Sequence, residues 1–422
     1  MDILVVGSGG REHAIIKKLK ESPKAGHIYA APGNGGIAAD AECVAIKATD
    51  IAGVVAFAKE KAVGFVVVAP DDPLVLGMVD VLNDAGIPAF GPTRAAAAIE
   101  GSKVFSKWLM KKYDIPTAAY ESFDDAQQAV DYLKRQNSYP AVIKADGLAL
   151  GKGVVIPENE QEAVQAVRAM MEEGAFGESG RRVVIEEFLT GIEVSVLAFT
   201  DGSIVVPMAS SMDHKRAHDN DEGLNTGGMG TIAPHPMFTP ALQERCMTEI
   251  FLPTIQAMKQ EGREFRGCLY FGLMLCADGP RVIEYNCRFG DPETQVVLPL
   301  LDGDLLEIMQ ATAQGRLADV KVGQKTGAAA CVIIASGGYP VSYQKGYPIH
   351  GLDEKGGAAG VTVYHAGTAL ENGVFQNNGG RVLGVTATGD TLKAALDKAY
   401  AATANIGFDG SFYRHDIGKK VL

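Results

Sequence analysis

The chain has 422 residues, a formal net charge of −12 and an apolar fraction of 47%. This length exceeds what one ordinary hydrophobic core organises, so we expect two to four domains in a well-packed soluble protein. The negative charge argues against a nucleic-acid partner, because nucleic-acid phosphates are bound through an excess of Lys and Arg. No apolar run approaches membrane-spanning length and no basic leader precedes the first strand, so we expect a cytoplasmic protein without a membrane partner. The six cysteines form no CxxC pair, and we interpret them as buried small hydrophobes in a reducing compartment.

The chain opens with a strand, a glycine-rich turn and a helix. The strand is predicted at residues 2–6, the turn is Gly7-Ser8-Gly9-Gly10, and the helix continues to about Lys20. Backbone N–H groups at the start of such a helix can hold a phosphate. A dinucleotide is disfavoured, because Glu12 stands at the third glycine position of the dinucleotide fingerprint and no ribose-binding acid follows the next strand. The turn therefore predicts a phosphate site for a smaller ligand.

Alternating strands and helices continue to about residue 92 and predict a doubly wound parallel sheet. A helix begins at Ile51, and strands are predicted at residues 64–69 and 87–90. In such sheets, ligands bind beside the loops that follow the strands. Asp71 follows the strand at 64–69, where it either faces a ligand or caps the next helix.

A second glycine-rich stretch, from Lys144 to Gly153, lies between two predicted strands at residues 141–144 and 154–156. It is not a Walker loop, because its spacing is one residue short and no Ser or Thr follows Lys152. We predict instead a mobile flap over nucleotide phosphates, with Lys144 and Lys152 as its cations. An ordinary glycine hairpin is the alternative.

Two segments further along carry polar residues in less regular surroundings. The strand predicted at residues 182–187 runs into Glu-Glu-Phe-Leu, a segment that resembles a hinge whose backbone could pair with an adenine edge. A long polar loop covers residues 211–230, and loops of this length are usually either functional or disordered. His214 and His218 lie in it, and we expect both to be solvated, because a zinc pair at this spacing needs a helix and a third ligand.

The stretch 281–295 carries the densest set of candidate site residues. It begins as a strand in which Val282, Glu284 and Asn286 share one face. A carboxylate and an amide oxygen are hard ligands suited to Mg2+ that bridges nucleotide phosphates. Arg288 continues this face, where its planar cation could clamp a phosphoryl oxygen. A surface strand end with solvated charges is the alternative, but it does not explain why these polar groups share one face of an apolar segment.

Two further acids and a smaller unit complete the chain. Asp291 and Glu293 follow in a loop broken by Gly and Pro, where the chain can turn toward a ligand. The last hundred residues, with strands near 329–335 and 381–387, predict a small α+β unit without an obvious reactive cluster. We interpret this unit as packing support that closes one side of the site.

Short motifs occur along the chain in the order found in one protein family. After the N-terminal glycine turn they are GSK, IKADGLALGKGV, EEFL, DHKR, NTGGMG, IEYNCRFGDPETQ, GGYP, YHAGT and GRVLGVTA. With these motifs the chain resembles the phosphoribosylamine–glycine ligases (glycinamide ribonucleotide synthetases) of the ATP-grasp superfamily. The resemblance extends from Ile3 to about Ile417. Each motif is weak alone, but the ordered set is highly specific.

The resemblance implies a two-step ligation in de novo purine biosynthesis. ATP phosphorylates the glycine carboxylate, and the amine of 5-phosphoribosylamine then attacks the glycyl phosphate, which gives glycinamide ribonucleotide, ADP and phosphate. The implied architecture has an N-terminal α/β domain for phosphoribosylamine (1–100), an ATP-grasp region (101–322) with a mobile lid (about 118–191), and a C-terminal α+β domain (323–422). Mg2+ or Mn2+ would be the metal, ATP a co-substrate, and we expect a monomer.

The resemblance also assigns roles to individual residues. ATP would be bound by Lys103, Lys144, Gly151, Lys152, Gly153, Glu186, Glu187, Phe188, Leu189 and Glu193. The metal would be bound by Glu284 and Asn286, and the catalytic residues would be Arg288, Asp213 and Lys215. The glycine and phosphoribosylamine sites would include Gly9, Gly10, Asp71, Asn225, Gly227, Gly228, Asp291 and Glu293.

Three departures from the family pattern leave questions open. The strand at 267–276 has no Asp or Glu, so the number of metal ions, one or two, is undecided; Asp71 replaces the usual Glu, and Leu224 a usual Pro. A related ligase or carboxylase with another acid or amine is the nearest alternative function. An NAD-dependent oxidoreductase and a non-catalytic nucleotide sensor are alternatives from other classes.

Overall fold

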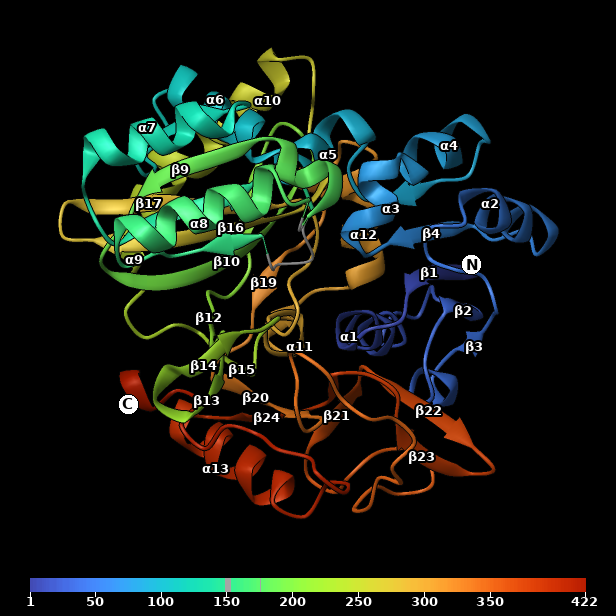
Figure 1. The fold of residues 1–422 in the computed structure, drawn as a ribbon. Helices are drawn as coiled ribbons and strands as arrows, with labels where there is room; N and C mark the ends of the chain where they lie inside the picture. The colour runs from blue at the N-terminus through green and yellow to red at the C-terminus, as the bar shows by residue number, and fades with distance from the viewer. Residues whose placement is uncertain (149–152, 175) are drawn as a thin grey trace.

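The computed structural model describes residues 1–148, 153–174 and 176–422. Figure 1 shows three lobes around a common centre: the N-terminal sheet in blue, the central sheets in green and yellow, and the C-terminal sheet in red. The short helix α11 (Thr294–Val297) packs against α1, β15 and β20 where the lobes meet. Within the described residues, no helix combines the length and apolar character needed to cross a membrane.

The N-terminal lobe is a parallel sheet with strand order β3-β2-β1-β4-β5. Its strands are β1 (Ile3–Gly7), β2 (Ile28–Pro32), β3 (Glu42–Cys43), β4 (Phe65–Val68) and β5 (Ala89–Phe90), and its helices are α1 (Gly10–Leu19), α2 (Ile51–Glu60), α3 (Asp71–Leu76), α4 (Met78–Asp84) and α5 (Arg94–Gly101). Successive residues of β1 point to opposite faces. Ile3 and Val5 share a core with α1, whereas Leu4 and Val6 share a core with α2 and α4. Helices therefore cover both faces, and the predicted doubly wound sheet is confirmed.

The central lobe contains two antiparallel sheets with strand orders β11-β10-β16-β17 and β6-β9-β7-β8. The first comprises β10 (Ile192–Thr200), β11 (Val205–Pro207), β16 (Gly267–Cys276) and β17 (Gly279–Asn286); the second comprises β6 (Tyr120–Phe123), β7 (Ala141–Ala145), β8 (Val154–Val155) and β9 (Val183–Glu187). The helices are α6 (Lys103–Lys112), α7 (Ala126–Gln136), α8 (Glu160–Met171), α9 (Pro240–Cys246) and α10 (Leu252–Gln260). The apolar faces of α7 and α8 form a core with β7 and β9. The glycine-rich stretch thus connects two neighbouring strands of the second sheet.

A β-bulge in β17 corrects one detail of the predicted strand. Ile283 is an extra residue between Val282 and Glu284, because the register with β16 shifts at this point. The bulge places Val282 in the buried core, whereas strict alternation would place it on the face of Glu284. It also frees the Ile283 carbonyl, which accepts a hydrogen bond from Lys144 Nζ at 3.0 Å. Bulges often re-aim groups in this way beside active sites.

The C-terminal lobe is a sheet with strand order β12-β15-β20-β24-β21. Its strands are β12 (Met212–Asp213), β15 (Gly230–Ala233), β20 (Ala328–Ala335), β21 (Thr362–His365) and β24 (Arg381–Gly389), and α13 (Leu392–Thr403) packs on β20 and β24. The described residues also form three two-stranded sheets and the helix α12 (Leu305–Ala313). The paired strands are β13 (Arg216–His218) with β14 (Glu222–Asn225), β18 (Leu301–Asp302) with β19 (Gly323–Gln324), and β22 (Thr368–Glu371) with β23 (Val374–Asn377). The polar segment at 211–230 is therefore ordered, and its ends are built into the C-terminal sheet.

Two sequence predictions about single residues are wrong. His214 is not solvated: it is buried, with Nδ1 3.1 Å from the Gly230 carbonyl and Nε2 accepting from Gly418 N at 3.0 Å. Burial lowers its pKa to about 4, so it stays neutral. Among the cysteines, Cys43 is exposed and Cys276 only half-buried, whereas the other four are buried.

Candidate active site

The predicted metal ligands Glu284 and Asn286 lie on β17 at the edge of the first central sheet. No described cation lies within ion-pair distance of the Glu284 carboxylate. Burial raises the pKa of Glu284, but the charges of Lys215, Lys144 and Lys103 outweigh this effect and hold the pKa below its usual value. An ionised, unpaired carboxylate beside an amide oxygen fits a hard cation.

Glu284 and Asn286 leave positions of the coordination shell that substrate phosphates and water can fill. Among the described residues, no group of three His, Cys, Asp or Glu side chains is placed to hold a metal. The position opposite Glu284 on β16 is Gly272, and Tyr270 is opposite Asn286. Mg2+ typically combines one or two carboxylates with substrate phosphates, and the arrangement fits that pattern.

Arg288 extends the polar face of β17 and is held by a residue that the sequence did not reveal. Its guanidinium lies 3.2 Å from Glu100 Oε1 and 3.3 Å from Asn286 Oδ1, while its buried Nε has no partner among the described residues. Glu100 is itself buried and accepts a hydrogen bond from Cys287 N at 2.7 Å. The charge of Asp71 acts on both Glu100 and Arg288, which places Asp71 in the same neighbourhood. Asp71 is the first residue of α3 and not its cap, which is Pro70.

Lys144 forms part of a closed charge cluster beneath the predicted nucleotide site. The carboxylate of Glu186 lies 2.8 Å from Lys144 Nζ and 2.8 Å from Lys107 Nζ, and all three side chains are buried. Lys107 Nζ also donates to Thr117 Oγ1 at 2.8 Å. Burial lowers the pKa of Lys107 to about 8 even though Glu186 opposes this shift. The Glu186 side chain is thus occupied by lysines, and its backbone lies within the sheet opposite Tyr120 and Val142.

Lys103 is positioned by the break between α5 and α6. Ser102 caps α6 by accepting from Phe105 N at 3.1 Å, and its hydroxyl donates to Asp146 Oδ1 at 2.9 Å. Lys103 Nζ then donates to the carbonyl of Gly147 at 2.7 Å, so it lies at the base of the predicted flap. Gly153 accepts from Ala145 N at 2.8 Å, whereas Gly151 and Lys152 lie outside the described residues.

The predicted adenine hinge follows β9. Glu187 is engaged by Arg281 at 3.0 Å and by Ala119 N at 2.9 Å, so its carboxylate is already used. Phe188 is 43% exposed, and Leu189 is half-buried. Glu193 lies at the start of β10, 3.2 Å from Lys215 Nζ. Phe188, Leu189 and Glu193 therefore remain accessible to a ligand.

Asp213 and Lys215 lie close to this nucleotide region and to the loop at 225–230. Burial and the charge of Glu293 raise the pKa of Asp213 well above its usual value. Glu193 raises the pKa of Lys215. A Cβ on Gly228 would lie 2.5 Å from Asp213 Oδ1, and the φ of Gly228 is +113°, so only glycine fits here.

The N-terminal turn meets the acidic segment 291–293 of the central lobe. A Cβ on Gly9 would lie 3.4 Å from Asp291 Oδ2, and one on Gly10 would lie 3.7 Å from Asp291 Oδ1. The Gly9 N–H already donates to Glu12 Oε2 at 2.5 Å. Glu293 faces another neighbour, because its Oε1 is 3.4 Å from Ser195 Oγ. The turn therefore lies beside Asp291, whereas Glu293 points toward β10.

The C-terminal lobe, interpreted from sequence as packing support that closes one side of the site, also contributes two residues to this region. Arg381 donates to the Gly227 carbonyl at 2.6 Å, and the Gly227 N–H donates to Tyr339 Oη at 3.0 Å. Asn225, in contrast, is exposed at the end of β14. The GRVLGVTA motif, which contains Arg381, was the one sequence feature that could have indicated a functional role for this residue. The local sequence gave no indication of where its side chain would point.

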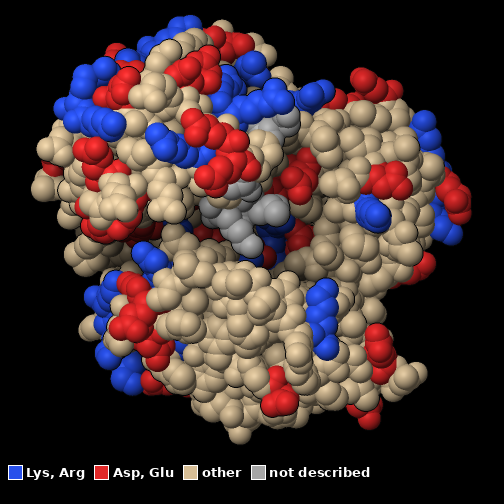
Figure 2. All heavy atoms as spheres, in the orientation of Figure 1, with Lys and Arg blue, Asp and Glu red and all other residues tan. Residues whose placement is uncertain are grey.

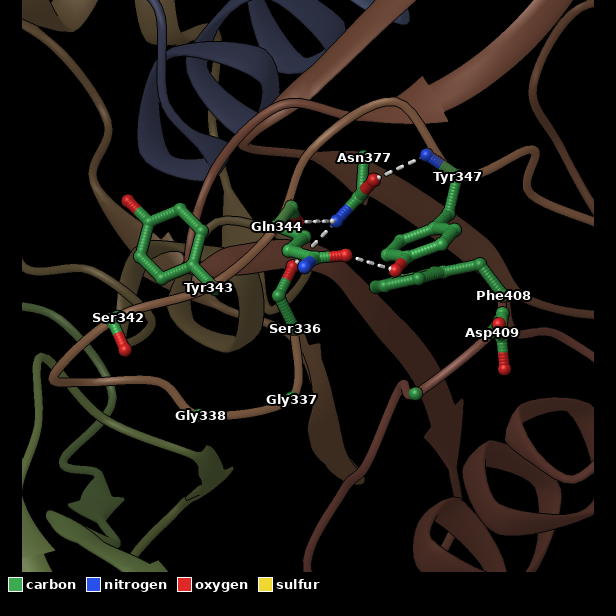
Figure 3. Close-up of a pocket in the computed structure, with 11 residues that line it drawn as sticks. Ser336, Gly337, Gly338, Ser342, Tyr343, Gln344, Tyr347, Asn377, Phe408 and Asp409 are labelled. Atoms are coloured by element: carbon green, nitrogen blue, oxygen red, sulfur yellow. Dashed lines mark hydrogen bonds between the residues drawn. The ribbon is translucent and has the colours of Figure 1, made fainter.

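The surface agrees with a site between the lobes. In Figure 2 the molecule is hollowed where the three lobes meet, and acidic and basic side chains lie together around the hollow. A separate cavity of about 500 Å³ lies in the C-terminal lobe (Figure 3). It is lined by Ser336, Gly337, Gly338, Ser342, Tyr343, Gln344, Tyr347, Asn377, Phe408, Asp409 and Gly410. None of these is a Lys or Arg or a predicted site residue, so the cavity lacks cations for a nucleotide and is not the candidate active site.

The two antiparallel central sheets, with lysines at the flap and an unpaired carboxylate on β17, define an ATP-grasp enzyme. Family models agree over most of the chain: those of phosphoribosylglycinamide synthetase match as the N domain at residues 1–100, the ATP-grasp (A) domain at 101–294 and the C domain at 329–420. The chain belongs to the phosphoribosylglycinamide synthetase family.

Individual relatives match over their full length. A phosphoribosylamine–glycine ligase of Vibrio vulnificus is 48% identical, over 100% of this chain and 99% of its own; one of Agrobacterium fabrum is 49% identical with the same coverage. The crystal structure of a phosphoribosylamine–glycine ligase from Thermotoga maritima superposes with a TM-score of 0.85 at 33% identity, covering 99% of this chain and 100% of that one. A biotin carboxylase from Campylobacter jejuni shares the fold, with a TM-score of 0.75 at 16% identity, covering 98% of this chain and 92% of that one.

Proposed function

We propose that this protein ligates glycine to 5-phosphoribosylamine at the expense of ATP and forms glycinamide ribonucleotide, ADP and phosphate in de novo purine biosynthesis. The full-length similarity to phosphoribosylamine–glycine ligases carries this proposal. Glu284, Asn286 and Arg288 on one polar face, with Lys144 beside that face, support it further.

The first step is phosphoryl transfer to glycine. A glycine carboxylate oxygen attacks the γ-phosphorus of ATP, the bond to the ADP oxygen breaks, and glycyl phosphate forms. Such transfer depends on positioning and on neutralising charge more than on a protein nucleophile. Lys103 and Lys144 would bind the nucleotide phosphates, and the unpaired Nε–H of Arg288 would bind the transferring group. Glu284 and Asn286 would hold Mg2+ or Mn2+, which supplies charge neutralisation for the phosphates.

The second step is acyl transfer. The amine nitrogen of phosphoribosylamine attacks the glycyl carbonyl carbon, and the carbon–oxygen bond to phosphate breaks. Phosphorylation is required because an unmodified carboxylate would have to lose oxide. Asp213, which lies against Gly228 beside the acceptor side of the site, would take the proton that the amine loses. Arg288 and Lys215 would stabilise the negative charge of the acyl phosphate.

We place the substrate sites at the N-terminal glycine turn and at the acidic segment 291–293. Gly10 and the start of α1, with Asp71, would hold the ribose phosphate of phosphoribosylamine. Asp291 and Glu293 would bind the amine substrate and glycine. The N-terminal lobe (1–100), the ATP-grasp region (101–322) and the C-terminal lobe (323–422) would act as one monomer in the cytoplasm, without nucleic acid or membrane.

Release of ADP by the purified protein with Mg2+ and ATP tests the proposal. Glycine is added alone and then together with phosphoribosylamine formed in the assay from ribose 5-phosphate and ammonia. We expect release that requires both substrates and yields glycinamide ribonucleotide. Release with a different acid or amine would move the substrate assignment, and ATP binding without turnover on any acceptor would point to a nucleotide sensor.

A further inference from the structure

Arg381, the first residue of β24, reaches from the C-terminal lobe to two segments of the candidate active site. Its NH1 donates to the carbonyl of Gly227 at 2.6 Å and to that of Asp291 at 2.7 Å. Its NH2 lies 3.1 Å from the Asp291 carboxylate, and the side chain is largely buried, at 19% exposure. A guanidinium presents several donors in one rigid plane and can hold such separate acceptors together, whereas an ammonium is a single point charge.

The two segments that Arg381 joins both belong to the acceptor side of the site. Gly228, which follows Gly227, packs directly on the carboxylate of Asp213. Asp291 faces the N-terminal glycine turn, where the ribose phosphate is proposed to bind. The lysines proposed for ATP make their contacts elsewhere: Lys103 with Gly147 and Lys144 with Glu186 and Ile283.

We propose that Arg381 is a positioning residue for the amine acceptor: it fixes the Gly227–Gly228 segment and the Asp291 carboxylate relative to each other, and so governs the use of phosphoribosylamine but not of ATP. This inference rests on the function proposed above. It gives the C-terminal lobe a part in the chemistry, and Tyr339 Oη, which accepts from the Gly227 N–H at 3.0 Å, holds the same segment from the same lobe.

The charge of Arg381 also bears on the ionisation of Asp291. Burial raises the pKa of Asp291, but Arg381 and then Arg11 outweigh it, so the pKa lies below its usual value. Without Arg381 the effect of burial is less opposed, and the pKa of Asp291 rises. The other titratable or charged groups that face this pair are Arg11, Asp213, Arg288, Glu293, Cys331 and Tyr339.

The test compares Arg381→Ala, Arg381→Lys and Tyr339→Phe in the full chain by steady-state ADP release. Loss of charged hydrogen bonds should lower kcat/KM for phosphoribosylamine about ten- to hundredfold in Arg381→Ala, with KM for ATP within about twofold of wild type. The acid limb of its pH profile should move to higher pH, because Asp291 then protonates more readily. Arg381→Lys should restore the acid limb but recover little of kcat/KM, because a point charge cannot hold all three acceptors.

Lys393→Ala is the matched control, because Lys393 is an exposed cation of the same lobe that pairs with Asp397; it should behave as wild type. The inference is overturned if Arg381→Ala keeps its kcat/KM for phosphoribosylamine and its acid limb, or if ATP and phosphoribosylamine parameters worsen equally. Should Arg381→Ala not fold, Arg381→Lys and Tyr339→Phe decide by kcat/KM alone: a loss selective for phosphoribosylamine supports the inference, and unchanged or equally worsened values overturn it. If wild type itself releases no ADP with glycine and phosphoribosylamine, the proposed function fails, which is a different result from an unaffected variant of an active enzyme.

Discussion

Glu186 and Glu284 are both carboxylates on strands of the central lobe, but their surroundings differ. Glu186 is closed between Lys107 and Lys144, each at 2.8 Å. Glu284 is influenced by several lysines, yet no described cation lies within ion-pair distance of it. A buried carboxylate paired on both sides has no free charge to offer a ligand, whereas an ionised, unpaired one is available to a cation. Two acids that the family resemblance assigns to the same ATP site thus have different surroundings: Glu186 holds two lysines, whereas Glu284 is left available for the metal that we propose it binds.

Replacing Arg288, whose charge acts on the unpaired carboxylate of Glu284, should have the largest effect on turnover. Arg288→Ala should lower turnover about a hundredfold or more, because it removes a preorganised donor to the transferring phosphoryl group. ATP binding should remain largely intact, since the lysine contacts do not involve Arg288. Single-turnover ADP formation and equilibrium ATP binding measure the two quantities separately. Turnover close to wild type would remove Arg288 from the mechanism.

Glu284→Ala should have the next largest effect and should act on binding. We expect the Mg2+–ATP complex to bind at least about tenfold more weakly, the scale on which even outer-shell partners of a metal act. In the presence of a chelator, wild type and variant should bind free ATP equally. Glu249→Ala is the matched control, because that carboxylate is also in the central lobe but pairs with Arg245 and was assigned no part in the site. Equal Mg2+–ATP affinity in wild type and Glu284→Ala would mean that the metal is held elsewhere.

The open half of the site was largely predictable from sequence, because its residues are close neighbours in the chain. Glu284 and Asn286 are spaced by two on one strand, Arg288 follows two residues after its end, and the strand–glycine–strand pattern located Lys144. Glu100 was missed because it meets Cys287 N across 187 residues, a contact that no local pattern encodes. Its only signal was an acid at the end of the apolar run AAAAIEG.

The prediction for His214 was wrong because the polar composition of its loop was misleading. A polar loop predicted a solvated imidazole, but Gly418, 204 residues further along, donates to its ring and the C-terminal segment buries it. Arg381 was missed for the same reason, since it meets Gly227 across 154 residues. Contacts between lobes therefore determined most of what the sequence did not reveal, while strand and helix order followed from periodicity.

Lys107 pairs with Glu186, the carboxylate that is held on both sides. Replacing Lys107 should have the smallest effect on activity. Lys107→Met keeps the length and apolar stem of the side chain but removes one of the two partners of Glu186 and the hydrogen bond to Thr117. Because Glu186 keeps Lys144, the free energy of unfolding should fall by only about 1–2 kcal/mol, less than for a buried charge left without any partner. Urea denaturation of the full chain measures this loss.

Turnover of Lys107→Met should stay within about threefold of wild type. Lys144→Met should lose both stability and activity, because Lys144 also reaches the Ile283 carbonyl beside Glu284. Equal losses of activity in the two variants would show that the pair around Glu186 takes part in the reaction directly, and the distinction between a closed and an open carboxylate would then not hold.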